Sequence, residues 1–132
     1  MIVGIGSDLI DIRRVEKVIE RHGERFIERI FTPVEIRKSE RRKLKAASYA
    51  KRFAAKEACF KALGTGWTRG VSFLQVEVRG LEGGQPELQL SGAAAERAQA
   101  LGVRRIHVSL THEADVAAAV VVLEGGPVSP SG

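Results

Sequence analysis

The hydrophobic pattern at the start of the chain predicts a short strand followed by two helices. The run MIVGIG at residues 1–6 is apolar and interrupted by glycine, which is typical of a buried strand, and Asp8 follows at its end. Over residues 11–22, apolar side chains recur on one helical face and basic side chains on another. Gly23 is expected to end this helix, and a second short helix carries the apolar residues of 26–30.

The middle of the chain predicts two more helices. Thr32 can cap a helix, Pro33 suits the first helical position, and Glu35 completes a capping box. A much longer helix is expected from about residue 46 to residue 63, with Gly64 as its C-terminal cap.

The second half of the chain changes to the period of β-strands. Residues 71–80 and 86–91 alternate around the turn sequence LEGG, which indicates a hairpin. A helix is expected over residues 93–102, followed by two strands over residues 104–112 and 116–124. The elements predict an α+β fold, because helices and strands occur in separate runs.

Length and composition favour one domain. The chain has 132 residues, and with 44% hydrophobic but only 5% aromatic residues its core must be built from Val, Ile, Leu and Ala. Neither repeat nor linker divides it, so we predict a single domain over residues 1–124 and a flexible tail over residues 125–132.

The sequence favours a cytoplasmic protein that does not contact membranes. The apolar runs are too short to cross a bilayer, and the N-terminal residues lack the basic start of a signal peptide. Cys59 is the only cysteine, so an internal disulfide is excluded.

The positive charge is concentrated in the first half of the chain. Residues 13–52 hold 14 of the 21 Lys and Arg residues and 6 of the 16 acids, a local balance of +8 against −3 for the rest. This asymmetry suggests an anionic partner, which could be a nucleic acid, an acidic protein or a phosphorylated ligand. The alternative is a solvated helical surface crossed by ion pairs.

Two carboxylates and a lysine are the candidate residues for a site that binds charged groups. Glu57 and Lys61 lie one turn apart on the long helix, and an ordinary surface pair of this kind contributes only a few tenths of a kcal/mol. However, small residues crowd this helix, and Gly64 and Thr65 follow it with backbone amides and a hydroxyl that suit an anion. Asp8 adds a second carboxylate. The lack of a Cys cluster and of paired His residues argues against zinc, whereas two hard oxygen ligands suit Mg²⁺ with phosphate.

Several stretches of the sequence resemble one protein family. GIGSDLIDIRRV and RFAAKEACFKALGTG are similar to the two acidic motifs of the bacterial holo-[acyl-carrier-protein] synthases, the small phosphopantetheinyl transferases. RIFTPVEI, GVSF and HVSLTHEADVAAAVVV match in type and order, so the resemblance extends to about Glu124. Ser7 and Asp11 depart from the commonest family residues. Ile10 stands where larger relatives have a third acid, so water is expected to complete the metal shell.

The resemblance implies a reaction and a fold. Enzymes of this family transfer the 4′-phosphopantetheine arm of coenzyme A to a serine of an apo-acyl carrier protein, with Mg²⁺, and release adenosine 3′,5′-bisphosphate. Such a chain has a small antiparallel sheet packed with a long central helix and forms homotrimers with the active site between subunits.

The resemblance also implies roles for individual residues. Asp8 and Glu57 bind Mg²⁺, Lys61 contacts the pyrophosphate of coenzyme A, and all three are catalytic. Whether Glu57 or a water on the metal removes the proton of the serine stays open. Other candidates for binding coenzyme A and its phosphates are Arg52, Lys43, Lys45, Gly64, Thr65, His107 and His112. The basic residues of the first helix and its neighbourhood are candidates for gripping the acidic carrier: Arg14, Arg21, Arg25, Arg13 and Lys17.

Two rival functions come from other classes. The basic segment permits a nucleic-acid-binding module, but aromatic residues are too sparse for a stacking platform and no nucleic-acid motif occurs. The second rival is a regulator that binds coenzyme A without catalysis. We expect no nucleic-acid partner.

Overall fold

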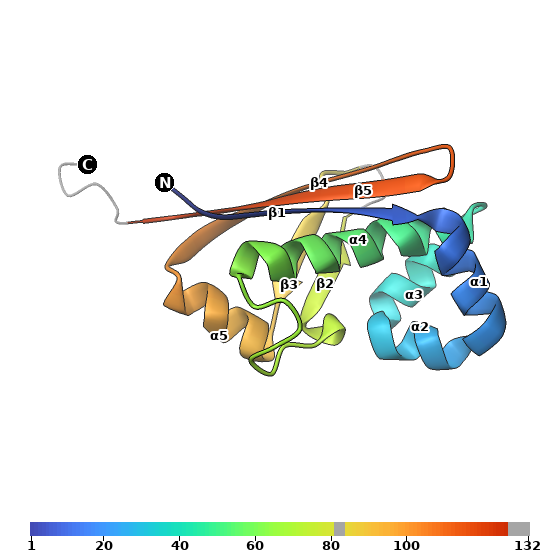
Figure 1. The fold of residues 1–132 in the computed structure, drawn as a ribbon, viewed down its shortest axis with the longest axis horizontal. Helices are drawn as coiled ribbons and strands as arrows, with labels where there is room; N and C mark the ends of the chain where they lie inside the picture. The colour runs from blue at the N-terminus through green and yellow to red at the C-terminus, as the bar shows by residue number, and fades with distance from the viewer. Residues whose placement is uncertain (81–83, 127–132) are drawn as a thin grey trace.

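A computed structural model describes residues 1–80 and 84–126 of the chain. Its main sheet is antiparallel, with the spatial order β1-β5-β4 (Figure 1). The strands are β1 (Ile2–Asp11), β4 (Val103–Glu113) and β5 (Val116–Gly125). A separate hairpin pairs β2 (Val76–Arg79) with β3 (Glu87–Leu90).

All helices lie on one side of the main sheet, as Figure 1 shows. The long helix α4 (Lys45–Leu63) lies against β1 and β5. The helices α1 (Ile12–His22), α2 (Glu24–Ile30) and α3 (Pro33–Glu40) gather at one end of the molecule, and α5 (Gly92–Ala100) lies at the other. The predicted α+β architecture is therefore confirmed.

Several local signals act as the sequence predicts. Thr32 and Glu35 form the reciprocal capping box at the start of α3. Gly64 ends α4 in the left-handed conformation, with a φ of 74°, which glycine adopts without steric cost. In the part of the chain that the structure describes, no helix is long and apolar enough to cross a membrane.

Two strand predictions are corrected by the structure. The first strand continues past residue 6 to Asp11, so Asp8 lies inside β1 rather than after it, because residues 7–11 stay paired with β5. Of residues 71–80, only Val76–Arg79 form a strand. The preceding Phe73–Gln75 form a 3₁₀ turn, η1, which a capping box between Ser72 and Gln75 closes.

The C-terminal boundary differs slightly from the prediction. Strand β5 ends at Gly125, one residue beyond the expected domain boundary, and pairs with the N-terminus through the carbonyl oxygen of Met1. The expected tail falls mostly on residues 127–132, which lie outside the described residues, as does most of the LEGG turn at 81–84.

Glycine lets β1 approach α4 closely. A Cβ atom at Gly6 would overlap the carbonyl oxygen of Ala58, and one at Gly4 would overlap that of Ala62. The close approach also requires small side chains on α4, where Ala54 and Ala58 are fully buried. Since side chains alternate along a strand, Asp8 faces α4 as Gly4 and Gly6 do.

The opposite face of the main sheet carries no helix. On β1, Ile5 and Leu9 point to this face and are 65% and 71% exposed. Val122 lies beside Ile5 in the register, and Ala118 beside Leu9. No described helix covers this face, which exposes apolar side chains of β1 and β5 beside the polar Ser109 and Thr111 of β4.

Candidate active site

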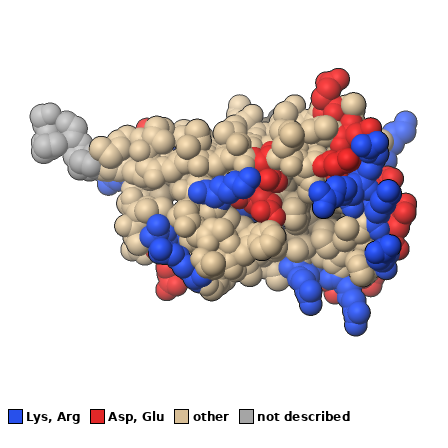
Figure 2. All heavy atoms as spheres, in the orientation of Figure 1, with Lys and Arg blue, Asp and Glu red and all other residues tan. Residues whose placement is uncertain are grey.

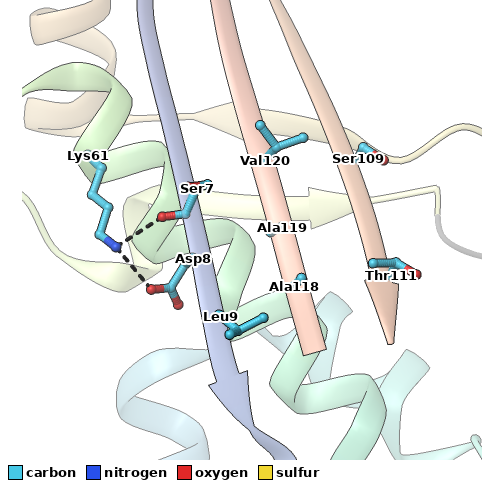
Figure 3. Close-up of a pocket in the computed structure, with 9 residues that line it drawn as sticks. All are labelled: Ser7, Asp8, Leu9, Lys61, Ser109, Thr111, Ala118, Ala119 and Val120. Carbon is cyan, nitrogen blue, oxygen red and sulfur yellow. Dashed lines mark hydrogen bonds and ion pairs between the residues drawn. The ribbon is translucent and has the colours of Figure 1, made fainter. Parts of the chain in front are cut away.

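Asp8 and Lys61 meet where β1 crosses α4. The Lys61 Nζ atom lies 3.2 Å from Asp8 Oδ1 and donates a hydrogen bond of 3.0 Å to the carbonyl oxygen of Ser7 (Figure 3). The Lys61 side chain is about half exposed, whereas Asp8 is largely shielded. Residues that are 53 positions apart in the sequence thus form one charged group at the surface.

Glu57 belongs to the same group. Partial burial raises the pKa of its carboxyl group, and the negative charge of Asp8 raises this pKa further. A hydrogen bond from the indole of Trp67 and the charge of Lys61 act in the opposite direction. The two carboxylates are therefore close enough to repel each other, and a cation between them would relieve this repulsion.

The donor set fits Mg²⁺ better than a transition metal. The described residues contain no cluster of three or more His, Cys, Asp or Glu side chains, which argues against a zinc site built by the protein alone. Mg²⁺ commonly takes only one or two carboxylates and completes its shell with water and phosphate oxygens. Asp8 and Glu57 supply this number of ligands.

A broad hollow adjoins the charged group. Asp8 and Lys61 line it from β1 and α4, and polar Ser109 and Thr111 line it from β4. Figure 3 shows these residues on both sides of the short side chains of Ala118 and Ala119 on β5. The hollow thus continues from the charged group toward the uncovered face of the sheet.

Arg52 lies in the interior of the protein rather than at a surface where it could bind coenzyme A. It is fully buried, and its Nη1 atom donates hydrogen bonds to Ser48 Oγ at 3.1 Å and to Ser39 Oγ at 3.3 Å. This burial is at odds with the expectation that Arg52 contacts coenzyme A. The sequence pattern misled because a guanidinium normally stays at the surface.

Gly64 and Thr65 form a closed cap rather than an open anion cradle. The Gly64 amide donates to the carbonyl oxygen of Lys61, and the Thr65 amide donates to that of Phe60. Thr65 is itself buried. In this conformation both amides are used by the end of α4, which argues against their expected role as anion ligands.

The remaining coenzyme candidates lie at three separate places. Lys43 and His112 line one hollow together with Arg42 and Lys51. Lys45 lies outside this lining and forms an ion pair of 3.0 Å with Glu40. His107 lies on β4, where its Nε2 atom is 2.9 Å from Glu124 Oε1.

The basic residues expected to bind a partner lie at the α1–α2–α3 end. Figure 2 shows Lys and Arg side chains gathered there among acids. Arg14, Lys17 and Arg21 line a shared depression on α1, and Arg25 lines the next one with Phe26.

Arg13 differs from the other basic residues of α1. Its guanidinium forms an ion pair of 3.0 Å with Asp11, the residue that caps α1, and lies 3.8 Å from Asp115. The hydrogen bonds from Arg13 lower the pKa of the Asp11 carboxyl group. Arg13 therefore fastens the start of α1.

Two features of the site were missed by sequence reasoning. Trp67 lies close enough to Glu57 to lower the pKa of its carboxyl group, although it lies ten residues further along the chain. Lys56, directly before Glu57, is fully buried and forms an ion pair of 2.7 Å with the equally buried Glu35. The sequence offered one signal for the first feature, a single tryptophan directly after the GTG turn, and none for the second, because Glu35 was already explained by its capping box.

Comparisons with known proteins agree with this geometry. Residues 4–121 match the family model described as the 4′-phosphopantetheinyl transferase superfamily. The chain is 60% identical over 128 residues to a holo-[acyl-carrier-protein] synthase of Chelativorans sp. (strain BNC1), covering 94% of this chain and 96% of that one. The crystal structure of the synthase from Neisseria meningitidis superimposes with a TM-score of 0.85 at 35% identity, covering 94% and 99%. That of the Helicobacter pylori synthase in complex with coenzyme A gives 0.79 at 35% identity, covering 91% and 99%.

Proposed function

Because this chain belongs to the bacterial holo-[acyl-carrier-protein] synthases of the 4′-phosphopantetheinyl transferase superfamily, we propose that it transfers the 4′-phosphopantetheine arm of coenzyme A to a serine of an apo-acyl carrier protein. The reaction depends on Mg²⁺ and releases adenosine 3′,5′-bisphosphate. The observation that carries the proposal is the meeting of Asp8, Glu57 and Lys61 at the crossing of β1 and α4. The coenzyme A bound to the Helicobacter pylori relative supports the choice of donor.

Asp8 and Glu57 would hold Mg²⁺, which supplies positive charge to the diphosphate of coenzyme A when bound. Lys61 binds a non-bridging phosphate oxygen and stabilises the charge that develops as the serine oxygen attacks phosphorus and the other phosphate leaves. Its ammonium now bonds to Asp8 and Ser7, but a half-exposed lysine can turn toward a phosphate at small cost.

The attacking serine must lose its proton. Glu57 is a candidate to accept it, because its carboxylate belongs to the charged group that Asp8 and Lys61 form beside the hollow. A water molecule in the hollow is the alternative acceptor.

The hollow lined by Lys43 and His112 is a candidate site for another phosphate of coenzyme A. Arg42 and Lys51 add two more nitrogen donors there, and Lys45 is held away by Glu40. Convergent cations are the arrangement that a phosphate monoester requires.

The acidic carrier protein would dock on α1. Arg14, Lys17 and Arg21 share one depression, and within the described residues none of them forms an ion pair like the one that holds Arg13 to its capping acid. Charges at such a surface chiefly accelerate association. We therefore assign contact with the carrier to these three and to Arg25, and a local structural role to Arg13.

The active unit is proposed to be a homotrimer. The uncovered face of the main sheet, with the exposed Ile5 and Leu9, is the surface that supports this assembly. Since the hollow beside Asp8 continues toward this face, a neighbouring subunit would form part of the wall of the site.

The experiment is to incubate the protein with apo-acyl carrier protein, coenzyme A and Mg²⁺ and to determine the mass of the carrier. We expect a gain of one phosphopantetheine, which EDTA prevents. Asp8→Ala and Glu57→Ala should each abolish the gain while circular dichroism shows an intact fold. Full activity of either variant would contradict the metal assignment.

Two further outcomes would favour the rival functions. Binding of coenzyme A without modification of the carrier would indicate a regulator. A salt-sensitive complex with random DNA, combined with no reaction of coenzyme A, would indicate a nucleic-acid-binding module.

A further inference from the structure

A second hollow opens at the end of the main sheet that carries the N-terminus, at the α5 end of the molecule (Figure 1). Between Met1 and Asp8 the strand β1 advances by roughly 20 Å, because each residue of a strand adds about 3.3 Å. The hollow is therefore separate from the charged group around Asp8. We call it the arginine hollow; it has a volume of about 590 Å³ and is lined by Met1, Arg104, Arg105, Glu124, Gly125 and Gly126.

The two arginines of this hollow are brought together by a β-bulge. The register of β4 steps from Val103 directly to Arg105 while β5 advances by one residue, so Arg104 is an extra residue in the strand. Neighbouring side chains of a regular strand point to opposite faces of the sheet, but a bulge re-aims them. Arg104 and Arg105 consequently line the same hollow, and both are exposed to solvent.

Another part of the wall is backbone that the fold holds in place. The amino group of Met1 donates a hydrogen bond of 3.0 Å to the carbonyl oxygen of Gly125, and the Gly125 amide donates one of 2.8 Å to the Met1 carbonyl oxygen. A Cβ atom on Gly125 would lie 2.2 Å from the carbonyl oxygen of Gly102, so glycine is required where β4 begins. The hollow is thus a fixed feature of this end of the sheet.

Positive charge exceeds negative charge in the arginine hollow. Its lining contains the amino group of Met1 and two guanidinium groups, against the single acid Glu124. The Nε2 atom of His107 lies 2.9 Å from Glu124 Oε1, and this hydrogen bond is the main cause that lowers the pKa of the Glu124 carboxyl group. Within residues 1–80 and 84–126, neither arginine has an acid at ion-pair distance. Three positive charges against one leave an excess of two.

We propose that the arginine hollow binds a phosphate dianion, either inorganic phosphate or the phosphate end of a nucleotide, through Arg104 and Arg105. A guanidinium presents paired N–H donors that match two phosphate oxygens, which a single ammonium does not. The excess of two positive charges equals the charge of the dianion. The inference does not depend on the proposed reaction, because the hollow shares no residue with the charged group around Asp8.

The first measurement locates the anion on the full-length protein by amide NMR. Sodium phosphate is added at about pH 7.5, where a phosphate monoester is a dianion, and sodium chloride at equal ionic strength is the control. We expect saturable shifts of the amide signals of Arg104, Arg105 and Gly126 with phosphate but not with chloride. Adenosine 5′-monophosphate distinguishes the two sources: it should shift these signals at a lower concentration than phosphate if a nucleotide is the ligand, and at a higher one if the free anion is.

The second measurement repeats the phosphate titration with single substitutions. Arg104→Gln and Arg105→Gln should each weaken binding about 10-fold or more, because each removes a charged hydrogen-bond donor. Both side chains are exposed, so the variants should retain the parental fold. Arg37→Gln is the matched control, since Arg37 is an exposed arginine of α3 outside the hollow and its loss changes the net charge equally. This control should titrate like the parent.

Three results would overturn the inference. Phosphate shifts confined to the signals of Lys43, Lys51 or Lys61 would place the anion at the sites proposed for coenzyme A. Equal weakening by all three glutamine variants would reduce the effect to net charge. Finally, phosphate could leave the signals of the hollow unchanged while the Arg104 and Arg105 variants lower the mass in sedimentation equilibrium, and the hollow would then be a contact between copies of this chain.

Discussion

The buried ion pair between Lys56 and Glu35 should dominate the stability of the chain near the active site. The Lys56 Nζ atom has three acceptors: Glu35 Oε1 at 2.7 Å and the carbonyl oxygens of Phe73 at 2.9 Å and Val76 at 2.5 Å. The other oxygen of Glu35 accepts a hydrogen bond of 2.8 Å from the Val78 amide. Burial lowers the pKa of Lys56, and the charge of Glu35 partly offsets this effect, so each charge depends on the other.

Replacing Lys56 with methionine keeps an unbranched four-atom stem but removes the ammonium, which leaves a buried carboxylate without a counterion. Removing one partner of a buried pair typically costs about 3–5 kcal/mol. For a domain of this size each kcal/mol lowers the melting temperature by about 3–4 °C, so Lys56→Met should melt about 10–20 °C below the parent. Because assembly stabilises subunits by mass action, the variants must be compared at equal protein concentration.

Urea unfolding of both single variants and the double variant completes the test. Glu35→Gln should be destabilising for the reciprocal reason, and Lys56→Met with Glu35→Gln should cost clearly less than the sum of the two. Lys45→Met is the matched control, since Lys45 and Glu40 are separated by 3.0 Å but are both well exposed. Such a pair contributes less than about 1 kcal/mol. The reasoning is refuted if Lys56→Met costs no more than this control or if the two buried substitutions are additive.

Four further predictions concern the site and its partners. Gly6→Ala should force β1 away from α4, because the Cβ atom of the new alanine would meet the Ala58 carbonyl oxygen. Overpacking of this kind lowers the free energy of unfolding by about 1–3 kcal/mol. A shift of about 1 Å in a catalytic group can also lower kcat about 100-fold. Unfolding and steady-state assays check both effects, and parental values in both would contradict the close approach. Leu9→Lys should dissociate the proposed trimer in sedimentation equilibrium, and an unchanged mass would exclude this face as the interface. Carboxyl NMR of the metal-free protein should show Glu57 titrating at higher pH than an ordinary glutamate, so that it gains its negative charge only as the pH rises through this elevated pKa. Asp8→Asn should shift that titration to lower pH, and no shift would mean that the two carboxylates do not interact. Charge reversal at Arg14 should raise KM for the carrier more than KM for coenzyme A, and equal increases would argue against docking on α1.

Sequence reasoning found most of the elements because these depend on local signals. The capping box at Thr32 and the left-handed Gly64 act within a few residues of themselves. Asp8 and Glu57 were joined by family resemblance, and the electrostatic coupling between them is visible only in the folded chain.

The errors have a common physical origin in tertiary contacts. Arg52 was treated as an exposed cation, yet the fold encloses it with Ser39 and Ser48. The segment before β2 was treated as strand, yet it forms the turn η1, whose Phe73 carbonyl oxygen binds the ammonium of Lys56 instead of a neighbouring strand. Local alternation cannot show a distant side chain that competes for backbone groups.

The string Lys56-Glu57 followed by Lys61 shows how one helix can serve stability and chemistry together. Adjacent residues on an α-helix differ in direction by about 100°, so Lys56 points into the core while Glu57 points toward β1. The ordinary pairing of Glu57 with Lys61, four residues apart, is replaced by a bond from Lys61 to Asp8. Among the described residues, Glu57 is thereby left without a direct ion pair. A carboxylate held in this way keeps its charge available for an incoming cation, which a direct ion pair on the helix would have neutralised.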